Sequence, residues 1–185
     1  MKSSSKTNWN PKRLDVQAFA LAGGQLASEG MATPFDRLRG ECAPGSGDLE
    51  PMSWRANGEM RAQGAGKAQP WLHLEAEGAL TVVCQRCLGS VRVPLLVDRW
   101  FRFVADEAAA EAEDDESEED VLALEPRPDL EALLEDELLM ALPLVPMHEV
   151  CPEPVVMRLA DGDASKPEDE EPRKSPFAEL ARLKK

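Results

Sequence analysis

The chain has 185 residues, and 43% of them are hydrophobic, which is enough for one packed domain with tails. It contains no run of 18 apolar residues, which argues against a transmembrane helix, and its first 15 residues have lysines but no apolar stretch of a secretory signal. We therefore expect a cytoplasmic protein without a membrane partner, whose four cysteines favour metal ligands or free thiols over disulfides.

The charge of the chain is strongly uneven. The formal net charge is −14, but residues 105–137 alone hold 16 acidic side chains and one basic side chain, Arg127. The rest of the chain is close to neutral. The acidic balance argues against uniform coating of nucleic acid, yet it leaves room for a basic contact face elsewhere.

The first 50 residues carry few regular patterns. Residues 1–13 are polar and basic, which predicts a flexible tail. A short apolar pattern predicts a helix at about 15–22, ended by Gly23 and Gly24. Residues 41–50 have the composition of a loop.

Strand patterns follow. The segment around Asn57-Gly58 alternates in polarity, and this dipeptide favours a tight hairpin turn. Alternation predicts one strand at 71–84, and Val, Leu, Trp and Phe favour another at 91–104, where Pro94 indicates an edge or a bulge. Short connections between successive strands favour an antiparallel sheet.

Residues 105–120 form a low-complexity acidic run, which predicts an extended, solvated loop because like charges repel. Apolar residues then recur at helical spacing and predict a helix over 130–141 whose leucine face docks on the sheet. Asp129 would cap its start and Pro143 would end it. Four carboxylates should cover its solvent side: Glu131, Glu135, Asp136 and Glu137.

The predicted architecture is therefore α+β: an antiparallel sheet core with a packed amphipathic helix, a disordered acidic insertion and flexible tails. We expect a single domain at 14–157. Residues 158–174 have the composition of a linker, and Ser175 starts a short C-terminal helical pattern within the segment 158–185.

The cysteines and histidines suggest one metal site. Cys84 and Cys87 have the spacing of a zinc knuckle, and His148 and Cys151 could complete a Cys3His set for one structural zinc. Cys42 could replace His148. The alternative interpretation is a turn that binds no metal. Redox chemistry is less favoured, because a strand rather than a helix N-terminus adjoins the cysteine pair.

A group of arginines alternates with aromatic residues beyond the cysteine pair. Trp100, Phe101 and Phe103 either stack on bases or face the core, and core packing is the favoured interpretation. The arginines could contact RNA phosphates or balance the acidic run; they are Arg86, Arg92, Arg99 and Arg102.

Signatures of catalysis are missing from the sequence. There is no phosphate-binding glycine loop, no HExxH and no G-x-S-x-G motif. Two histidines and no tyrosine leave few groups for acid–base work. We therefore expect a protein that is not an enzyme; a thiol oxidoreductase or a hydrolase is the least favoured alternative.

Three motifs together resemble the bacterial large ribosomal RNA subunit accumulation protein family, YceD: "CQRCLGSVRVPL", "DLEALLEDELLMALPLVPMHEVC" and "SPFAELARLKK", in that order. The resemblance spans about residues 70–185. It implies a non-enzymatic cytoplasmic factor for the synthesis, processing or stability of 23S ribosomal RNA. The family motifs place their CxxC on Cys84 and Cys87, their acidic triplet on 135–137, and their final His and Cys on His148 and Cys151.

Two functions follow as hypotheses. In the first, the protein acts on large-subunit ribosomal RNA or on a precursor particle. In the alternative, it is a protein–protein adaptor or chaperone that holds a basic ribosomal protein through its acidic insertion, without direct RNA contact.

Overall fold

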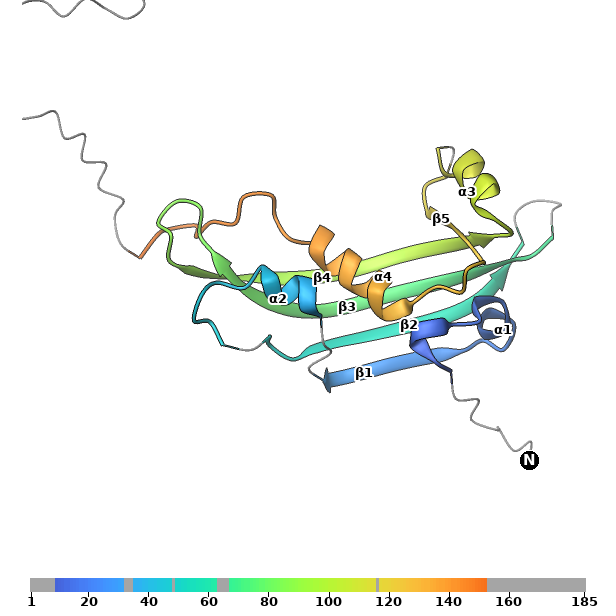
Figure 1. Ribbon diagram of the computed structural model, residues 1–185, viewed down its shortest axis with the longest axis horizontal. Helices are drawn as coiled ribbons and strands as arrows, with labels where there is room; N and C mark the ends of the chain where they lie inside the picture. Colours follow the sequence, from blue (N-terminus) through green and yellow to red (C-terminus); the bar gives the residue numbers. More distant parts are fainter. Residues whose placement is uncertain (1–8, 32–34, 48, 63–66, 116, 153–185) are drawn as a thin grey trace, which may run out of the picture. The chain divides into compact units, whose positions relative to one another are not determined.

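The computed structural model describes residues 9–31, 35–47, 49–62, 67–115 and 117–152 (Figure 1). These residues belong to the first of two units, Met1–Glu153, and the second unit is Pro154–Lys185. The predicted linker and C-terminal helix at 158–185 lie outside the described residues, as do residues 1–8 of the predicted tail.

In the described part of the chain, five strands form one sheet in the order β1-β2-β3-β4-β5 (Figure 1). They are β1 Gln25–Met31, β2 Met52–Arg61, β3 Gln69–Val83, β4 Ser90–Val104 and β5 Asp120–Ala123. The first four strands pair antiparallel, as predicted, whereas β5 runs parallel to β4. The α+β class is confirmed, but the sheet is mixed, because the chain crosses over through helix α3 (Glu107–Asp114) before it returns as β5.

The long hairpin of β3 and β4 forms the centre of the sheet and confirms both predicted strands. Its register is continuous from Trp71 opposite Arg102 to Val83 opposite Ser90. Alternate residues such as Leu72, Leu74 and Leu80 face the core. Pro94 lies on an edge, because β5 pairs with β4 only at Phe101–Val104.

The predicted hairpin turn at Asn57-Gly58 is wrong, because both residues lie inside β2. Helix α1 (Val16–Leu21) packs so closely on this strand that a Cβ at Gly58 would lie 2.4 Å from the ring of Phe19. The glycine therefore serves close packing rather than chain reversal.

Two helices lie on the core face of the sheet with α1 (Figure 1): α2 (Asp36–Gly40) and α4 (Leu130–Met140). As predicted, Asp129 caps α4 by accepting the backbone N–H groups of Glu131 and Ala132. Leu130, Leu134 and Leu138 are at most 1% exposed and join the core. Their burial anchors the helix to the sheet.

The structure differs from the predicted flexible tail at its last residues. Pro11–Arg13 form a 3-10 helix, η1, whose first turn is capped by Asn10. Trp9 packs edge-on against Phe19 with ring centroids 5.3 Å apart. An aromatic contact to the core thus holds residues that composition alone assigns to a tail.

The acidic insertion also differs from the prediction of an extended, disordered loop. Asp106 caps α3 by accepting the N–H of Ala109, and α3 and β5 pack on the end of β4. Ala110, Val104 and Val121 form a small buried cluster there. Alanines interspersed with the acids supply an apolar helix face, which the charge pattern alone obscures.

Candidate functional site

The turn between β3 and β4 carries the first two cysteines. The N–H of Cys84 donates to the carbonyl of Gly89 at 2.8 Å, and the N–H of Leu88 donates to the carbonyl of Cys84 at 2.9 Å. Leu88 has a φ of 60°, in the left-handed region that a leucine seldom adopts. This tight knuckle holds Cys84 and Cys87 on one side of the turn.

The segment after α4 brings the second pair to the knuckle. The N–H of Gln85 donates to the carbonyl of Pro146 at 2.9 Å and so ties the returning chain to the turn. His148 and Cys151 follow directly. The fold therefore brings together two pairs of residues that are about 60 positions apart in the sequence. The motif spacing alone could not show that they meet.

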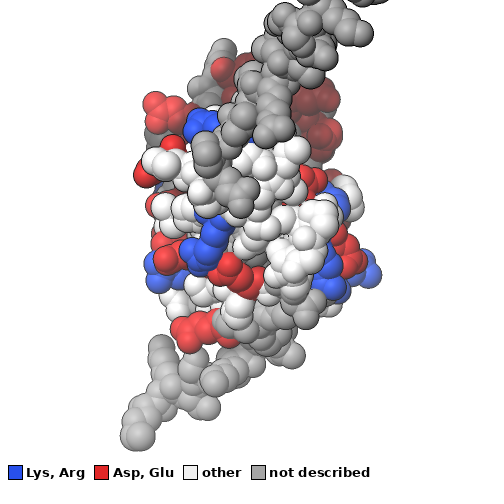
Figure 2. Space-filling view, turned by 90° about the vertical axis from the view of Figure 1, so that its left-hand side faces the viewer, with Lys and Arg blue, Asp and Glu red and all other residues white. Residues whose placement is uncertain are grey.

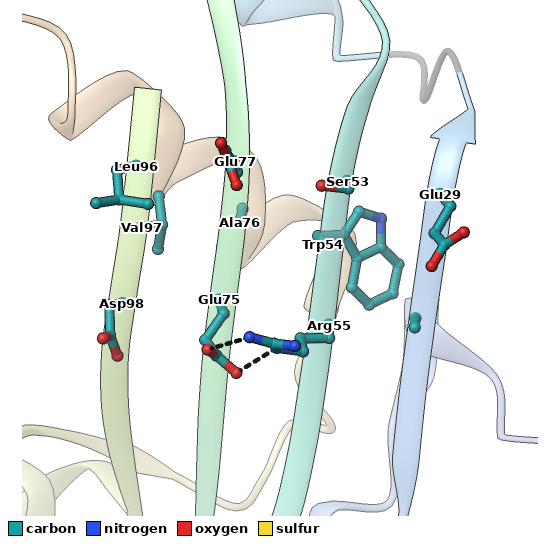
Figure 3. Close-up of a pocket in the computed structure, with 11 residues that line it drawn as sticks. Glu29, Ser53, Trp54, Arg55, Glu75, Ala76, Glu77, Leu96, Val97 and Asp98 are labelled. Atoms are coloured by element: carbon teal, nitrogen blue, oxygen red, sulfur yellow. Dashed lines mark hydrogen bonds and ion pairs between the residues drawn. The ribbon is translucent and has the colours of Figure 1, made fainter. Parts of the chain in front are cut away.

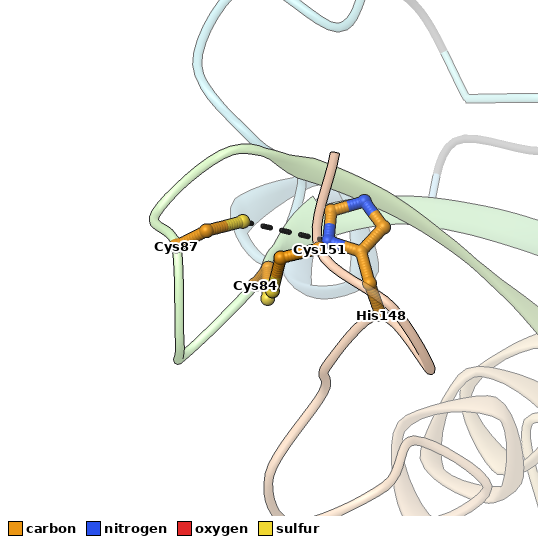
Figure 4. A group of neighbouring side chains, drawn as sticks. All are labelled: Cys84, Cys87, His148 and Cys151. Atoms are coloured by element: carbon orange, nitrogen blue, oxygen red, sulfur yellow. Dashed lines mark hydrogen bonds between the residues drawn. The ribbon is translucent and has the colours of Figure 1, made fainter. Parts of the chain in front are cut away.

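The four predicted ligands form one group (Figure 4). Their ligand atoms all lie within 4.8 Å of one another, with Cys84 buried and the other three half-buried. In a tetrahedron with Zn–S bonds of about 2.3 Å, ligand sulfurs are roughly 3.8 Å apart, so small shifts would close the group around an ion.

The histidine is oriented for a ligand role. Its Nε2 lies 3.1 Å from the carbonyl oxygen of Ser90, which can only accept a hydrogen bond, so Nε2 carries the proton. Its Nδ1 then presents a lone pair and lies 3.5 Å from Sγ of Cys87. A hydrogen bond from the other ring nitrogen to a backbone carbonyl is a common support for a metal-bound histidine.

The thiols have opposite electrostatic environments. The backbone N–H of Cys87 is the main cause that lowers the pKa of Cys84 to about 5, helped by His148 and Arg86 against the effect of burial. Burial and the neighbouring sulfurs of Cys87 and Cys84 raise the pKa of Cys151. One thiolate is thus favoured, and a cation would be needed to accommodate more.

The residues fit zinc. Three thiols and an imidazole are a usual ligand set of structural zinc, and the fold brings all four together from two segments. Cys42 is not among them; it packs half-buried against the core. The alternative ligand set with Cys42 in place of His148 therefore has no support in the geometry.

Comparison with protein families gives one match. The model of the family described as large ribosomal RNA subunit accumulation protein YceD covers residues 72–184. The chain belongs to the YceD family. The name of this family links its members to the accumulation of large-subunit ribosomal RNA. No curated protein and no solved structure matches the chain.

The matched range has a clear place in the fold of this YceD protein. It begins in β3 and includes β4, the knuckle, α3, α4 and the segment that carries His148 and Cys151. It therefore contains all four candidate ligands. Among the described residues, no helix is long and apolar enough to cross a membrane.

The four arginines proposed for RNA contact lie in different surroundings. Arg86 is exposed in the knuckle, where its Nη2 lies 3.8 Å from Sδ of Met147. Arg92 binds Glu50 at 2.8 Å, and Arg99 binds Asp120 at 2.6 Å. These three side chains keep solvent-facing surface.

Arg102 is only 2% exposed. It pairs with Glu113 and with Glu119 and also donates to Ser117 at 2.7 Å. Its guanidinium is thus committed to holding α3 and β5 against β4. Phe101 and Phe103 are buried, as favoured from the sequence, but the prediction of core packing is wrong for Trp100, which is half-buried and stacks on His73.

Two glutamates of α4 depart from the predicted solvated face. Glu135 is 8% exposed and accepts the backbone N–H groups of Arg37 at 2.8 Å and Leu38 at 3.2 Å, as well as Nε of Arg37. Burial acts to raise its pKa, but these donors outweigh burial and lower the pKa. Glu135 therefore fastens the start of α2 to α4.

Glu137 is 6% exposed and faces the other way, toward β4. Its carboxylate lies 3.6 Å from Nε of Arg99. Burial raises its pKa, and Asp120 and Asp136 add to the rise while Arg99 opposes it. The helical spacing of the leucines gives no sign of this burial, because the covering strand is distant in sequence.

The outer face of the sheet, opposite the helices, holds a hollow of about 390 Å³ that sequence reasoning missed (Figure 3). Its charged lining residues are acidic except for Arg55, which binds Glu75 at 2.6 Å. Nearby, His73 stacks on Trp100 with centroids 4.1 Å apart and meets Asp98 at 2.7 Å. Stacking on Trp100 and the contact with Asp98 therefore hold the His73 ring at the surface.

Proposed function

We propose that this protein is a non-enzymatic cytoplasmic factor that supports the synthesis, processing or stability of 23S ribosomal RNA. The observation that carries the proposal is the YceD family match over residues 72–184. That range contains the knuckle and the segment packed against it, so the family region coincides with the candidate metal centre.

We infer that one structural zinc joins Cys84, Cys87, His148 and Cys151. The buried Cys84, the oriented imidazole and the ligand distances support this role. The metal would hold the segment after α4 against the knuckle, and so give this end of the sheet a defined surface. Zinc in a closed Cys3His set is structural rather than catalytic.

The knuckle end is the surface that we assign to the RNA or the precursor particle. Figure 2 shows the end of the molecule at the left of Figure 1, where uncharged surface borders both positive and negative side chains. Exposed apolar side chains of the knuckle and the return segment include Leu88, Leu144 and Val150. Arg86 and Arg92 supply cations for phosphate contacts beside them.

The test is binding of the full chain to 23S ribosomal RNA fragments at several salt concentrations. Replacing Arg86 and Arg92 together by alanine should weaken binding about tenfold and reduce the salt slope by about 1.5, as expected for two lost phosphate contacts. Arg55→Ala is the matched control, since Arg55 lies on the outer face in an ion pair with Glu75. Equal binding by the double variant and by the control would contradict the assigned surface.

Metal content tests the zinc proposal separately. Purified protein should contain one zinc per chain, and Cys84→Ser should lose it. Cys42→Ser is the matched control, because Cys42 lies outside the ligand group. Equal zinc contents in the two variants would contradict the proposed ligand set.

The alternative function, an adaptor or chaperone for a basic ribosomal protein, is favoured by the surface of α3 and its flanks. Among the residues that the structure describes there, six carboxylates are exposed: Asp106, Glu107, Glu111, Asp114, Asp115 and Glu118. A comparison of partners separates the two functions. Binding to free ribosomal proteins with no binding to naked 23S fragments would favour the adaptor.

A further inference from the structure

The side of β4 that faces away from β3 is open over most of its length. In the part of the chain that the structure describes, β5 is the strand on this side, and it pairs only with Phe101–Val104. At the other end, the ring of His148 binds the carbonyl of Ser90. Residues 91–100 lie between these two contacts and form the free edge of β4.

The direction of the backbone groups on this edge follows from the hydrogen bonds at its ends. The carbonyls of Val104 and Ser90 both accept hydrogen bonds from this side, from Leu124 and His148. Because successive residues of a strand turn to opposite sides, Leu96 and Asp98 also direct their N–H and C=O groups outward. Pro94 shares this direction but has no N–H to offer.

A hollow of about 420 Å³ adjoins the free edge on the side of α4. It is lined by residues 96–99 of β4 and by Glu137, Met140 and Ala141 at the end of α4. Leu96 and Met140 are 73% and 67% exposed, which is unusual for large apolar side chains. The edge thus combines open backbone groups with apolar contact surface.

Glu137 adds a charge to this hollow. Its carboxylate is 6% exposed and accepts no hydrogen bond from the described residues. Arg99 lies 3.6 Å from it but directs Nη2 to Asp120 at 2.6 Å. A buried carboxylate without hydrogen-bond donors is costly, and an added cation would supply them.

We propose that the free edge of β4 binds an extended basic segment of a partner protein, which adds as a strand at Leu96 and Asp98 and places a lysine or arginine at Glu137. The side chains of an added strand alternate between the two faces of the sheet. One set reaches Glu137 and Met140, and the other reaches Leu96 and the exposed Asp98. The net charge of −14 disfavours a second copy of this chain as the occupant.

The test uses a fluorescent ten-residue peptide of alternating valine and lysine as the probe for the full chain, with a valine–glutamate peptide as its control. Leu96→Pro removes the outward N–H without removing a bond to β3, and Pro94 shows that this strand accepts proline in the same orientation. This variant should raise the Kd of the lysine peptide about tenfold, as for one lost hydrogen bond. Leu96→Thr keeps the N–H and should bind far better than Leu96→Pro.

Charge is tested separately by Glu137→Gln, which should raise the Kd about tenfold or more. Glu29→Gln makes the same change of net charge on β1, three strands away from β4, and should leave the Kd unchanged. Hydrogen exchange at Leu96 and Asp98 should slow when the lysine peptide binds. This exchange measurement does not depend on a variant that folds.

Three results would overturn the proposal. The lysine peptide could fail to bind, or it could bind Leu96→Pro and Glu137→Gln as it binds the wild type. A dimer in sedimentation that Leu96→Pro dissociates would show instead that a second copy covers the edge. None of these results bears on Arg86 and Arg92, so the proposed RNA surface stands or fails independently.

Discussion

At the scale of single residues, two glutamates of α4 stand two positions apart and should respond oppositely to pH. Glu135 accepts two backbone N–H groups and the guanidinium of Arg37, and its pKa is lowered despite burial. An acid with a lowered pKa stabilises the fold above its ordinary pKa, and this contribution is lost as the pH falls through the lowered value.

Replacing Glu135 by glutamine should therefore reduce the free energy of unfolding by about 2 kcal/mol at pH 7, since charged hydrogen bonds to α2 are weakened. The difference from the wild type should shrink as the pH falls below the ordinary glutamate pKa. Urea unfolding at pH 7 and pH 4 measures both effects. An equal loss of unfolding free energy at the two pH values would show that the shape of the Glu135 side chain, rather than its charge, holds α2.

Glu137 should have the opposite effect on how stability depends on pH. Burial raises its pKa, so its contribution to stability is greatest below the ordinary glutamate pKa and is lost as the pH rises through the raised value. Glu137→Gln should therefore be more stable than the wild type at pH 7, by about 1 kcal/mol, and lose this advantage at acidic pH. A less stable variant at pH 7 would mean that the ion pair with Arg99 outweighs the cost of burial.

Neither glutamate could be recognised from the sequence. Helical spacing identified the leucine face and the Asp129 cap, because both depend on neighbours three or four positions away. Glu135 and Glu137 are buried by α2 and β4, which pack against α4 from distant parts of the chain. A polar residue on the flank of an amphipathic helix looks solvated until its tertiary neighbours are known.

At the scale of elements, Arg102 fixes α3 and β5 to the sheet. It is 2% exposed and binds Glu119 at 2.7 Å and Ser117 at 2.7 Å. Arg102→Met keeps much of the side-chain volume but removes the cation from partners that are themselves charged. The free energy of unfolding should fall by about 3 kcal/mol, as is typical when one member of a buried pair is lost.

The change at Arg102 should also be local. Hydrogen exchange in residues 107–123 should accelerate in Arg102→Met more than exchange in β3. Arg55→Met is the control, because Arg55 forms a solvent-exposed pair with Glu75, and such pairs contribute little to stability. Equal losses in the two variants would contradict the structural role of Arg102.

The alternating patterns of β3 and β4 predicted their strands correctly, whereas the acidic run did not predict its own structure. Alternation along β3 and β4 is set by two faces of one sheet, so a local period was sufficient. The run at 105–120 differs because the buried Arg102 pairs with Glu113 and Glu119, which lie 11 and 17 residues further along the chain. The predicted turn at Asn57-Gly58 is wrong because the glycine allows close contact with Phe19, a residue distant in the sequence.

At the scale of the whole molecule, the candidate metal centre joins two parts of the family region that are distant in the sequence. Cys84 and Cys87 close the central hairpin, while His148 and Cys151 end the segment that follows α4. The sequence supplied the four ligands, but only the fold shows that the segment after α4 returns to the knuckle. A metal at this position would couple the sheet to the docking of that segment.

Removal of zinc should therefore destabilise the molecule and loosen one end of it. With free zinc at a thousandfold excess over its Kd, the metal contributes about 4 kcal/mol, which corresponds to roughly 10 °C in Tm for a chain of this size. Thermal melting with a chelator, and again after zinc is restored, measures the shift and its reversal. Hydrogen exchange should rise at residues 84–90 and 146–151 and stay unchanged at the centre of β3.

Cys84→Ser should melt like the chelated protein and should not respond to zinc, while Cys42→Ser should respond like the wild type. A Tm unaffected by the chelator, in protein shown to lose its metal, would remove the structural role of the site.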